Sequence, residues 1–332
     1  MTIPKLIVQT HEEYPRRGSP LYQSIQSIRD MHPDFIYEFF DAVQRRQFLA
    51  AHCPASVVDA YDFLVPGAFK ADLFRYAYLY ERGGCYIDCK MVAKKSLSRY
   101  IASRSESLVL CVDYERSNTL DRGYPVTSYL NAIMCAAPRS EIMLQMRTAC
   151  VDNILSRQDY FSKAFHRSGF TEVLDMTGPT LLYRIAQPLI DPSQLRLKHV
   201  ILNNDETIAS NFQIVDIDSG ELVLEKTCDL SGEPRSQPHY SILWREGCLF
   251  YKNVRHSDDW IFLVHPHVYN DAFNFKQVSG GSVQVERTQS QGWFLDLTLT
   301  IINRKTSLFA ICHIGASPTS VANRAFDFDA LS

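Results

Sequence analysis

The sequence lacks several features that would place it in a broad class at once. Its 34 basic and 37 acidic side chains nearly balance, so no bulk positive charge favours nucleic acid as a partner. No apolar run approaches the length of a membrane span, and the opening residues MTIPKLIVQT are too short and too interrupted for a signal peptide. We therefore expect no transmembrane segment and no nucleic-acid partner.

The cysteines lack the paired spacing of metal and redox motifs. There are nine of them, an odd number, and they are scattered without a C-x-x-C pair. This usage favours a reduced, cytoplasmic protein, and it leaves open a peripheral association with a membrane. Cys85 and Cys89 have no further cysteine or histidine close to them in the sequence, which disfavours a zinc site there.

Strand and helix patterns alternate through most of the chain. With 332 residues and 46% hydrophobic content, the chain can form one large domain and a small one. The alternation predicts an α/β fold with a Rossmann-like, mainly parallel sheet and flanking helices. We expect strands at 3–10, 35–40 and 107–112, and helices at 20–31, 43–52, 54–64 and 140–155.

The pattern changes near residue 265. Beyond it, apolar and polar residues alternate in short runs between turns, which predicts a small antiparallel β module. We expect one large α/β domain over 1–265 and this module over 266–332. The module could bind a ligand of the large domain, pair subunits or cover the large domain, and the sequence leaves both this role and the oligomeric state open.

The stretch 69–90, FKADLFRYAYLYERGGCYIDCK, is the most informative part of the chain. Apolar residues at helical spacing predict a helix, and Asp72 and Arg75 share one neighbouring face of it. Gly83 and Gly84 end the helix and a short strand follows, with Asp88 directly after it. Ligands of open α/β sheets bind outside the carboxyl ends of the strands, so Asp88 is the first candidate for chemistry.

This stretch resembles the DXD-containing sugar-binding region of family thirty-two glycosyltransferases, which is related to mannosyltransferases and clostridial glucosylating toxins. The pattern there is roughly D-x-x-R-Y, a tyrosine-rich helix, G-G and Y-x-D-x-D. The positions that match are Asp72, Arg75, Tyr76, Gly83, Gly84, Tyr86 and Asp88. The second acidic position is Lys90. The resemblance implies a GT-A fold and transfer of a sugar from a nucleotide-sugar with retention, usually with Mn²⁺ or Mg²⁺.

Two further segments resemble landmarks of the same family. The opening I-P-K-L-I-V-Q-T is similar to a strand that contacts the nucleotide, with Val8 where the family has histidine. The resemblance implies that Val8, Gln9 and Thr10 bind the donor, and a plain core strand is the alternative. At the T-G-P turn, backbone N–H groups of Thr177 or Gly178 could hold an anion or a sugar hydroxyl, or the turn could simply start a helix.

Two later residues are candidates through resemblance alone. Related enzymes carry an H-x-x-x-x-W segment whose histidine completes the metal shell, and His239 and Trp244 have this spacing. The resemblance implies His239 as a metal ligand beside Asp88, and Trp244 packing on the sugar or nucleotide. A structural role for His239 is the alternative.

The catalytic candidates are Asp88, Asp72, Arg75 and Lys90. The reaction must stabilise the negative charge left on the diphosphate, with a divalent cation, with Lys or Arg, or with a helix N-terminus. Lys90 could bind the diphosphate and make the enzyme metal-independent, could turn aside while other groups hold metal, or could mark a site that only binds. Asp72 would bind a sugar hydroxyl and Arg75 sugar or phosphate, unless they form a plain surface ion pair.

Tyr86 completes the candidate donor-binding residues. It would stack on the donor or donate a hydrogen bond to it, and a buried strand tyrosine is the alternative. No catalytic base is identified, and the resemblance implies that the leaving diphosphate can take the acceptor's proton.

The leading hypothesis for the function is a cytoplasmic, retaining glycosyltransferase. It would move a sugar from a UDP- or GDP-sugar to a glycan or glycolipid acceptor, in surface polysaccharide or glycan synthesis. The alternatives are a toxin-like protein glycosyltransferase and a non-catalytic protein that binds sugar nucleotides or glycans.

Overall fold

A computed structural model gives the fold of the chain. It describes residues 2–101, 107–113, 128–156, 171–201 and 212–226, together with seven strands beyond residue 251. The chain divides into two compact units, residues 1–61 with 66–242, and residues 62–65 with 243–332. Within the described ranges, no helix is both long enough and apolar enough to cross a membrane.

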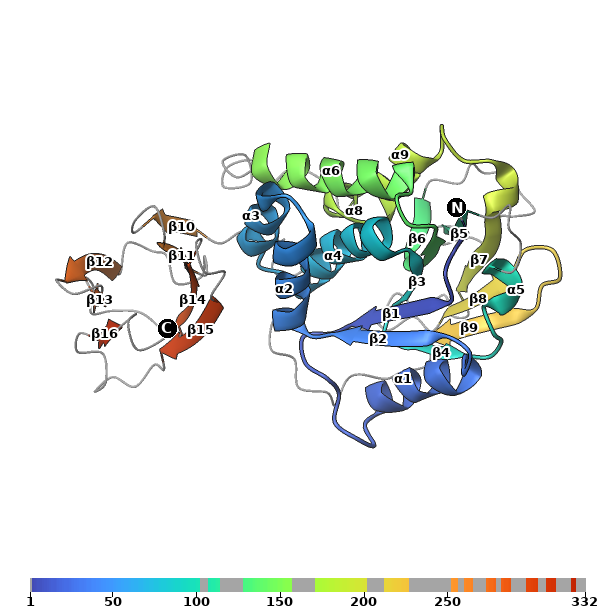
Figure 1. Cartoon of the computed structure of the whole chain (residues 1–332), viewed down its shortest axis with the longest axis horizontal. Helices are drawn as coiled ribbons and strands as arrows, with labels where there is room; N and C mark the ends of the chain where they lie inside the picture. The colour runs from blue at the N-terminus through green and yellow to red at the C-terminus, as the bar shows by residue number, and fades with distance from the viewer. Residues whose placement is uncertain are drawn as a thin grey trace. The chain divides into compact units, whose positions relative to one another are not determined.

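The first unit is built on a nine-stranded sheet (Figure 1). The strands lie in the order β2-β1-β3-β6-β5-β7-β8-β9-β4. In chain order they are β1 (Leu6–Thr10), β2 (Ile36–Phe40), β3 (Gly84–Ile87), β4 (Met91–Ala93), β5 (Leu108–Asp113), β6 (Ser128–Ala136), β7 (Leu195–Ile201), β8 (Phe212–Asp216) and β9 (Leu222–Lys226).

The sheet is mixed. Strand β1 pairs in parallel with β2 and β3, and β5 pairs in parallel with β7, whereas the other neighbours are antiparallel. The α/β class is therefore confirmed, but the expected mainly parallel sheet holds only for these pairs. Because β6 is antiparallel to both β3 and β5, the carboxyl ends of β1, β3, β5 and β7 all lie at one edge.

Helices cover both faces of this sheet, with α1 on one side and α4 and α6 on the other (Figure 1). The helices of the first unit are α1 (Pro20–Met31), α2 (Ala42–His52), α3 (Ala55–Phe63), α4 (Gly67–Arg82), α5 (Ser98–Ile101), α6 (Glu141–Ser156), α8 (Thr171–Met176) and α9 (Pro179–Ala186), with a 3-10 turn at Pro192–Gln194. Asp41 caps α2, and its carboxylate accepts from the backbone N–H of Gln44 in a full capping box.

Helix α4 is buried on almost every side. The periodicity predicted one apolar stripe, but every residue from Ala71 to Leu79 is buried, Asp72 and Arg75 included. Helices α2 and α6 pack beside α4, and the sheet lies beneath it. The polar residues of α4 are therefore enclosed by protein and must find partners there.

Two glycines join α4 to β3, as predicted. Gly83 has φ 67° and ψ −163°, a conformation that side chains strongly disfavour, and its N–H donates to the carbonyl of Leu79. Gly84 has φ 99°, and a Cβ atom there would lie 2.5 Å from the carbonyl oxygen of Leu6 on β1. The close approach of β3 to β1 thus requires glycine.

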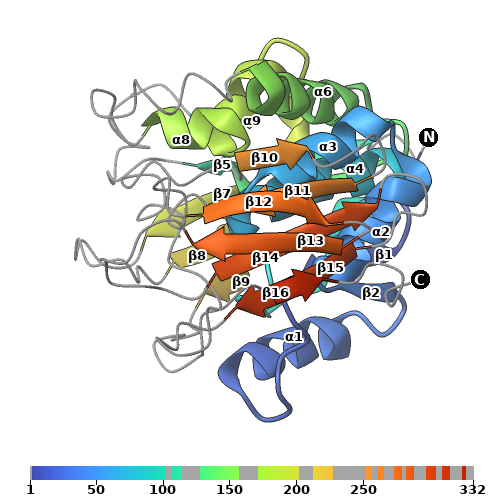
Figure 2. The ribbon, with the colours of Figure 1, turned by 90° about the vertical axis from the view of Figure 1, so that its left-hand side faces the viewer.

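The second unit consists of antiparallel strands (Figure 2). One sheet has the order β10-β11-β14-β15 and the other β12-β13-β16. The bounds are β10 (Lys252–Arg255), β11 (Trp260–Val264), β12 (Phe273–Val278), β13 (Ser282–Arg287), β14 (Leu297–Asn303), β15 (Phe309–Ile314) and β16 (Arg324–Phe326). Strand β11 ends at Val264 and pairs with β14, while the expected boundary at 265 stays a prediction.

Substituting Gly84 with alanine is expected to lower the free energy of unfolding by about 3 kcal/mol or more. About 1 kcal/mol comes from the positive φ and the rest from displacing the backbone of β1. Gly18 is the matched control, because its φ is also positive at 87° but nothing lies within 4 Å of its Cβ position. Urea unfolding should show a much smaller loss for Gly18→Ala; equal losses would contradict the steric argument.

Candidate functional site

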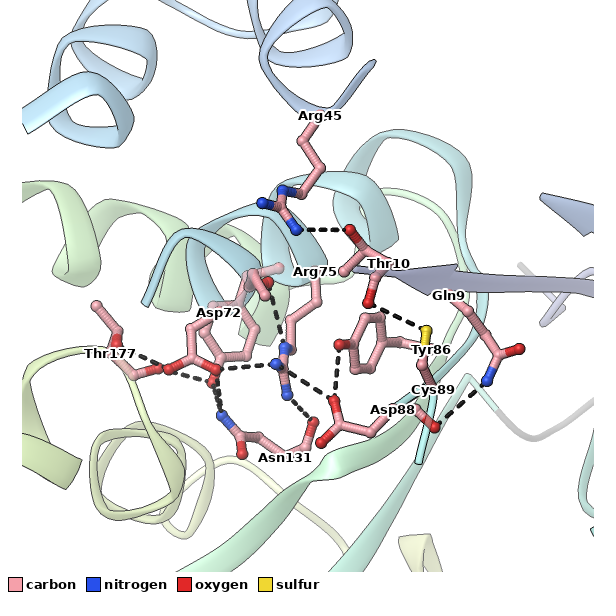
Figure 3. A network of polar contacts seen from close by, with 12 residues as sticks. Gln9, Thr10, Arg45, Asp72, Arg75, Tyr86, Asp88, Cys89, Asn131 and Thr177 are labelled. Atoms are coloured by element: carbon pink, nitrogen blue, oxygen red, sulfur yellow. Dashed lines mark hydrogen bonds and ion pairs between the residues drawn. The ribbon is translucent and has the colours of Figure 1, made fainter. Parts of the chain in front are cut away.

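The guanidinium of Arg75 lies at the centre of a buried polar cluster (Figure 3). Its Nη2 atom is 3.1 Å from Oδ1 of Asp72 and 3.5 Å from Oδ1 of Asp88. Nη1 donates to the carbonyl of Asn131 at 2.5 Å, and Nε donates to the carbonyl of Ala71. Most donors of Arg75 are therefore used within the protein.

The aromatic ring of Tyr86 packs against the guanidinium of Arg75. The guanidinium carbon of Arg75 lies 4.2 Å from its ring centroid, and its hydroxyl donates to Oδ1 of Asp88 at 2.7 Å. Burial opposes the charge on Arg75, but Tyr86, Asp72 and Asp88 outweigh it and raise the pKa of Arg75. The arginine thus stays protonated and fixes the two carboxylates in relation to each other.

Asp72 is 8% exposed and held from three directions. Its Oδ1 accepts from Nδ2 of Asn131 at 3.0 Å as well as from Arg75, and its Oδ2 accepts from the hydroxyl of Thr177 at 2.8 Å. Burial raises the pKa of Asp72 to about 6, against the opposing effect of Arg75 and of the Thr177 hydroxyl. The carboxylate still has lone pairs that could accept from a ligand hydroxyl.

Asp88 follows the last residue of β3, as predicted, at the edge where four carboxyl ends meet. Its N–H donates to the carbonyl of Ala132, and its carbonyl accepts from Met91 N–H and from Nε2 of Gln9. The side chain is 36% exposed, and its Oδ2 makes no hydrogen bond with the described residues. Asp88 therefore offers one carboxylate oxygen from a rigid backbone.

A side chain near the end of β1 holds the backbone of Asp88 in place. Gln9 is fully buried, and its Oε1 accepts from the hydroxyl of Tyr37 while its amide nitrogen reaches Asp88. Val8 is also fully buried, and the hydroxyl of Thr10 donates to Phe40 and accepts from the buried Arg45. These side chains are engaged within the protein, and their contact with a nucleotide stays a prediction.

Lys90 lies in a tight turn that follows Asp88. The N–H of Met91 donates to the carbonyl of Asp88 at 3.1 Å, which closes the turn. The thiol of Cys89 donates to the carbonyl of Thr10 at 3.1 Å and ties the turn to β1. Lys90 itself is exposed and makes no hydrogen bond or ion pair with the part of the chain described.

His11 is the neighbour of this exposed lysine. Burial lowers the pKa of His11, and the positive charges of Lys90 and Arg45 lower it further, against the carbonyl of Glu13 and the charge of Glu12. At neutral pH His11 is therefore uncharged. Lys90 is therefore an exposed positive charge close to Asp88 and to the uncharged His11.

In this cluster, the binding of a divalent metal ion would depend on Asp88 alone. Within the described ranges, no three or more His, Cys, Asp or Glu side chains gather closely enough to hold a metal ion. Mg²⁺ is often bound by one or two carboxylates together with substrate phosphates and water, so Oδ2 of Asp88 meets the minimum. His239 and Trp244 lie outside the described residues.

The T-G-P turn contributes a side chain where we expected backbone. Thr177 is fully buried, its hydroxyl reaches Asp72, and its carbonyl accepts from the hydroxyl of Tyr76 at 2.9 Å. The N–H of Gly178 donates to the carbonyl of Leu174, and Pro179 begins α9 as predicted. Anion binding by the Gly178 N–H has no support from this geometry.

Sequence reasoning missed the role of Asn131. It lies on β6, donates to both Asp72 and Tyr76, and its carbonyl accepts from Arg75. Asn131 and Pro138 have the spacing of an N-x-x-x-x-x-x-P segment, which resembles one in the glycosyltransferase family described above. This spacing was the signal in the sequence that could have identified Asn131. No local pattern links residue 131 to residue 72.

Comparisons with known proteins find one family model and several similar proteins. Residues 19–108 match the family model "Glycosyltransferase sugar-binding region containing DXD motif". Over 92 residues the chain is 39% identical to inositol phosphoceramide mannosyltransferase 2 of Schizosaccharomyces pombe, covering 26% of this chain and 24% of that protein. Over 187 residues it is 27% identical to the initiation-specific alpha-1,6-mannosyltransferase of the same organism, covering 53% and 46%.

The chain thus spans less than half the length of these two relatives. Among solved structures, a PaToxG glycosyltransferase is similar over 57% of this chain and 70% of that one, at 15% identity. Its TM-score of 0.38 is too low to establish a shared fold. The family match and the mannosyltransferase relatives support a glycosyltransferase enzyme.

Replacing Asp72 with asparagine is expected to change how stability depends on pH. The carboxyl has a pKa of about 6 when folded, above its ordinary 3.8, so folding favours its protonated form. The unfolding free energy of the wild type relative to Asp72→Asn should fall by up to about 3 kcal/mol as the pH rises from about 4 to about 6. Above about pH 7 the difference should be constant.

Urea unfolding at several pH values measures this difference. Asp30→Asn is the control, because Asp30 is exposed on α1. A wild-type-minus-variant difference that stays flat from about pH 4 to pH 7 would show that folding does not raise the pKa of Asp72, and would contradict this prediction.

Proposed function

We propose that this chain is a retaining glycosyltransferase of the GT-A type that uses a nucleotide-sugar donor and a glycan or glycolipid acceptor. The observation that carries the proposal is the buried Asp72–Arg75–Asp88 cluster at the carboxyl edge of the sheet. Ligands bind at such edges in α/β proteins. The match of residues 19–108 to a sugar-binding family model supports the same assignment.

The donor sugar would lie over the two carboxylates. Asp72 has acceptor capacity left for a sugar hydroxyl, and its pairing with Arg75, Asn131 and Thr177 holds it without the ligand. Such preorganisation lets binding energy orient the sugar instead of ordering the protein. Arg75 then acts mainly on the carboxylates, because most of its donors already have partners.

The reaction replaces one bond at the anomeric carbon by another. The bond from this carbon to the diphosphate oxygen breaks, a bond to an acceptor hydroxyl oxygen forms, and the hydroxyl proton passes to the departing diphosphate. The negative charge that develops on the diphosphate is the main electrostatic demand. Lys90 is the exposed cation beside Asp88 that can meet part of it.

A Mn²⁺ or Mg²⁺ ion would be held by Oδ2 of Asp88 and by donor phosphates. When bound, it would neutralise charge on the diphosphate. Lys90 would add a second positive charge from the protein, at the position where the D-x-D pattern has its second carboxylate. We therefore propose metal-assisted transfer in which Lys90 reduces the dependence on the metal.

A donor screen tests the proposed function. UDP- and GDP-sugars are compared by thermal shift and hydrolysis, with and without Mn²⁺, and GDP-mannose comes first because both relatives are named mannosyltransferases. One donor should stabilise the protein and be hydrolysed, and Asp88→Asn should lower hydrolysis by about 100-fold. Asp30→Asn should have no effect. If no donor is bound or hydrolysed, the proposal fails.

The Lys90→Ala variant tests whether the positive charge of Lys90 contributes to donor binding and lowers the need for the metal ion. The variant should bind the donor roughly tenfold or more weakly, as expected for a lost charge-assisted contact, and should need more Mn²⁺ for half-maximal hydrolysis. Lys5→Ala is the control, because Lys5 is an exposed lysine that pairs with Asp34. A Lys90→Ala enzyme that matches the wild type at every Mn²⁺ concentration, and after chelation, refutes this role.

A further inference from the structure

A second polar group lies at the same edge of the sheet, away from the donor cluster. Asp113 is the last residue of β5, Ser128 is the first of β6, and His199 is near the end of β7. Nδ1 of His199 lies 2.6 Å from Oδ1 of Asp113, and the hydroxyl of Ser128 donates to Oδ2 at 2.8 Å. Three neighbouring strands thus build one hydrogen-bonded group.

These contacts fix which nitrogen of His199 carries a proton. An ionised carboxylate only accepts, so Nδ1 of His199 must donate to Asp113. In the neutral imidazole, Nε2 is then a bare acceptor. The ring edge also packs against Phe212, with centroids 4.5 Å apart at an interplanar angle of 84°, which holds its orientation.

Among the described residues, the Nε2 atom of His199 has no hydrogen-bond partner. It is buried and makes no hydrogen bond within the described part of the chain. Buried polar atoms are normally paired, because a buried acceptor without a partner loses its hydrogen bonds to water and gains none from the protein. Together with the fixed ring orientation, this makes Nε2 an acceptor that is available to a ligand hydroxyl.

His32 shows what a purely structural histidine looks like in this protein. Its Nε2 accepts from the N–H of Leu97 at 2.9 Å, and its Nδ1 lies 2.7 Å from the carbonyl of Ile28. Both ring nitrogens of His32 are satisfied by backbone. His199 is less enclosed, with 11% of its side chain exposed, and leaves one nitrogen without a partner among the described residues.

The position of His199 indicates which substrate it meets. Strands β3 and β7 are separated by β6 and β5, which makes three inter-strand spacings. At about 4.8 Å each, this puts Asp88 and His199 roughly 14 Å apart across the sheet. One sugar ring cannot reach both residues, and β1, the predicted nucleotide side, lies beyond β3 in the other direction.

We propose that Nε2 of His199 accepts a hydrogen bond from a hydroxyl group of the acceptor, with Asp113 and Ser128 fixing the ring. This rests on the proposed function and adds an acceptor subsite to it. His199 binds the acceptor at this subsite and does not take part in bond breaking at the anomeric carbon. Asp113 is a positioning residue that acts through His199.

Binding without turnover gives the first test. The imidazole nitrogens of His199 are followed by NMR, and assigned with His199→Gln, while methyl α-mannoside, methyl β-galactoside and myo-inositol are added separately. At least one probe should shift the Nε2 signal to saturation and leave the signals of His32 unchanged. If none of the three shifts the His199 signals, the proposal is overturned.

Kinetics separates this inference from the proposed function. His199→Ala should raise the KM for the bound probe about 3- to 10-fold, the loss expected for one hydrogen bond, while hydrolysis of the donor without acceptor stays within about twofold. His199→Gln keeps an acceptor oxygen near the position of Nε2 and should lose less. Asp113→Asn should raise the same KM, because the carboxylate no longer holds Nδ1.

The controls identify a merely structural effect. The His32→Gln variant should lower the melting temperature and leave the KM for the probe and the KM for the donor unchanged. If His199→Ala lowers the melting temperature but leaves the probe KM at the wild-type value, His199 only joins β5 to β7 and the inference is wrong. If the wild type hydrolyses no donor at all, the proposed function fails instead.

Discussion

The first unit depends on neutralising charge inside helix α4. Arg75 and Asp72 are 5% and 8% exposed, and burying either alone would be prohibitively costly. Their mutual pairing, the second carboxylate of Asp88 and the ring of Tyr86 make the burial possible. Helix, strand and turn must therefore keep their relative positions, because a shift of one would leave a charge without its partner.

Local patterns predicted the local parts of this arrangement. The spacing of Asp72 and Arg75, the two glycines and the acid after the strand each lie within a short stretch, and the structure has the predicted helix, turn and strand there. The full burial of α4 could not be read from its own periodicity, because it depends on α2 and α6 packing beside it. The antiparallel strand β6 was missed for a similar reason: its pairing with β3 and β5 is set by tertiary contacts.

The carboxyl edge of the sheet divides into neighbouring regions with different chemistry. On the β1–β3 side, the side chains of Gln9 and Thr10 are committed to supporting the backbone, and Lys90 is the exposed charge. On the β5–β7 side, Asp113, Ser128 and His199 form a hydrogen-bonded group. Under the proposals above, the charged donor binds on the β1–β3 side and an uncharged acceptor hydroxyl binds on the β5–β7 side.

The partners of Asp72 also set an order of assembly. Asn131 and Thr177 bind its carboxylate from 59 and 105 residues further along the chain. During synthesis α4 is complete long before residue 177 leaves the ribosome, so the carboxylate cannot be enclosed with all its partners at that stage. Closing such long loops is slow relative to forming helix α4 itself. The Asp72–Arg75–Asp88 cluster is thus a late product of folding, although most of its residues are made early.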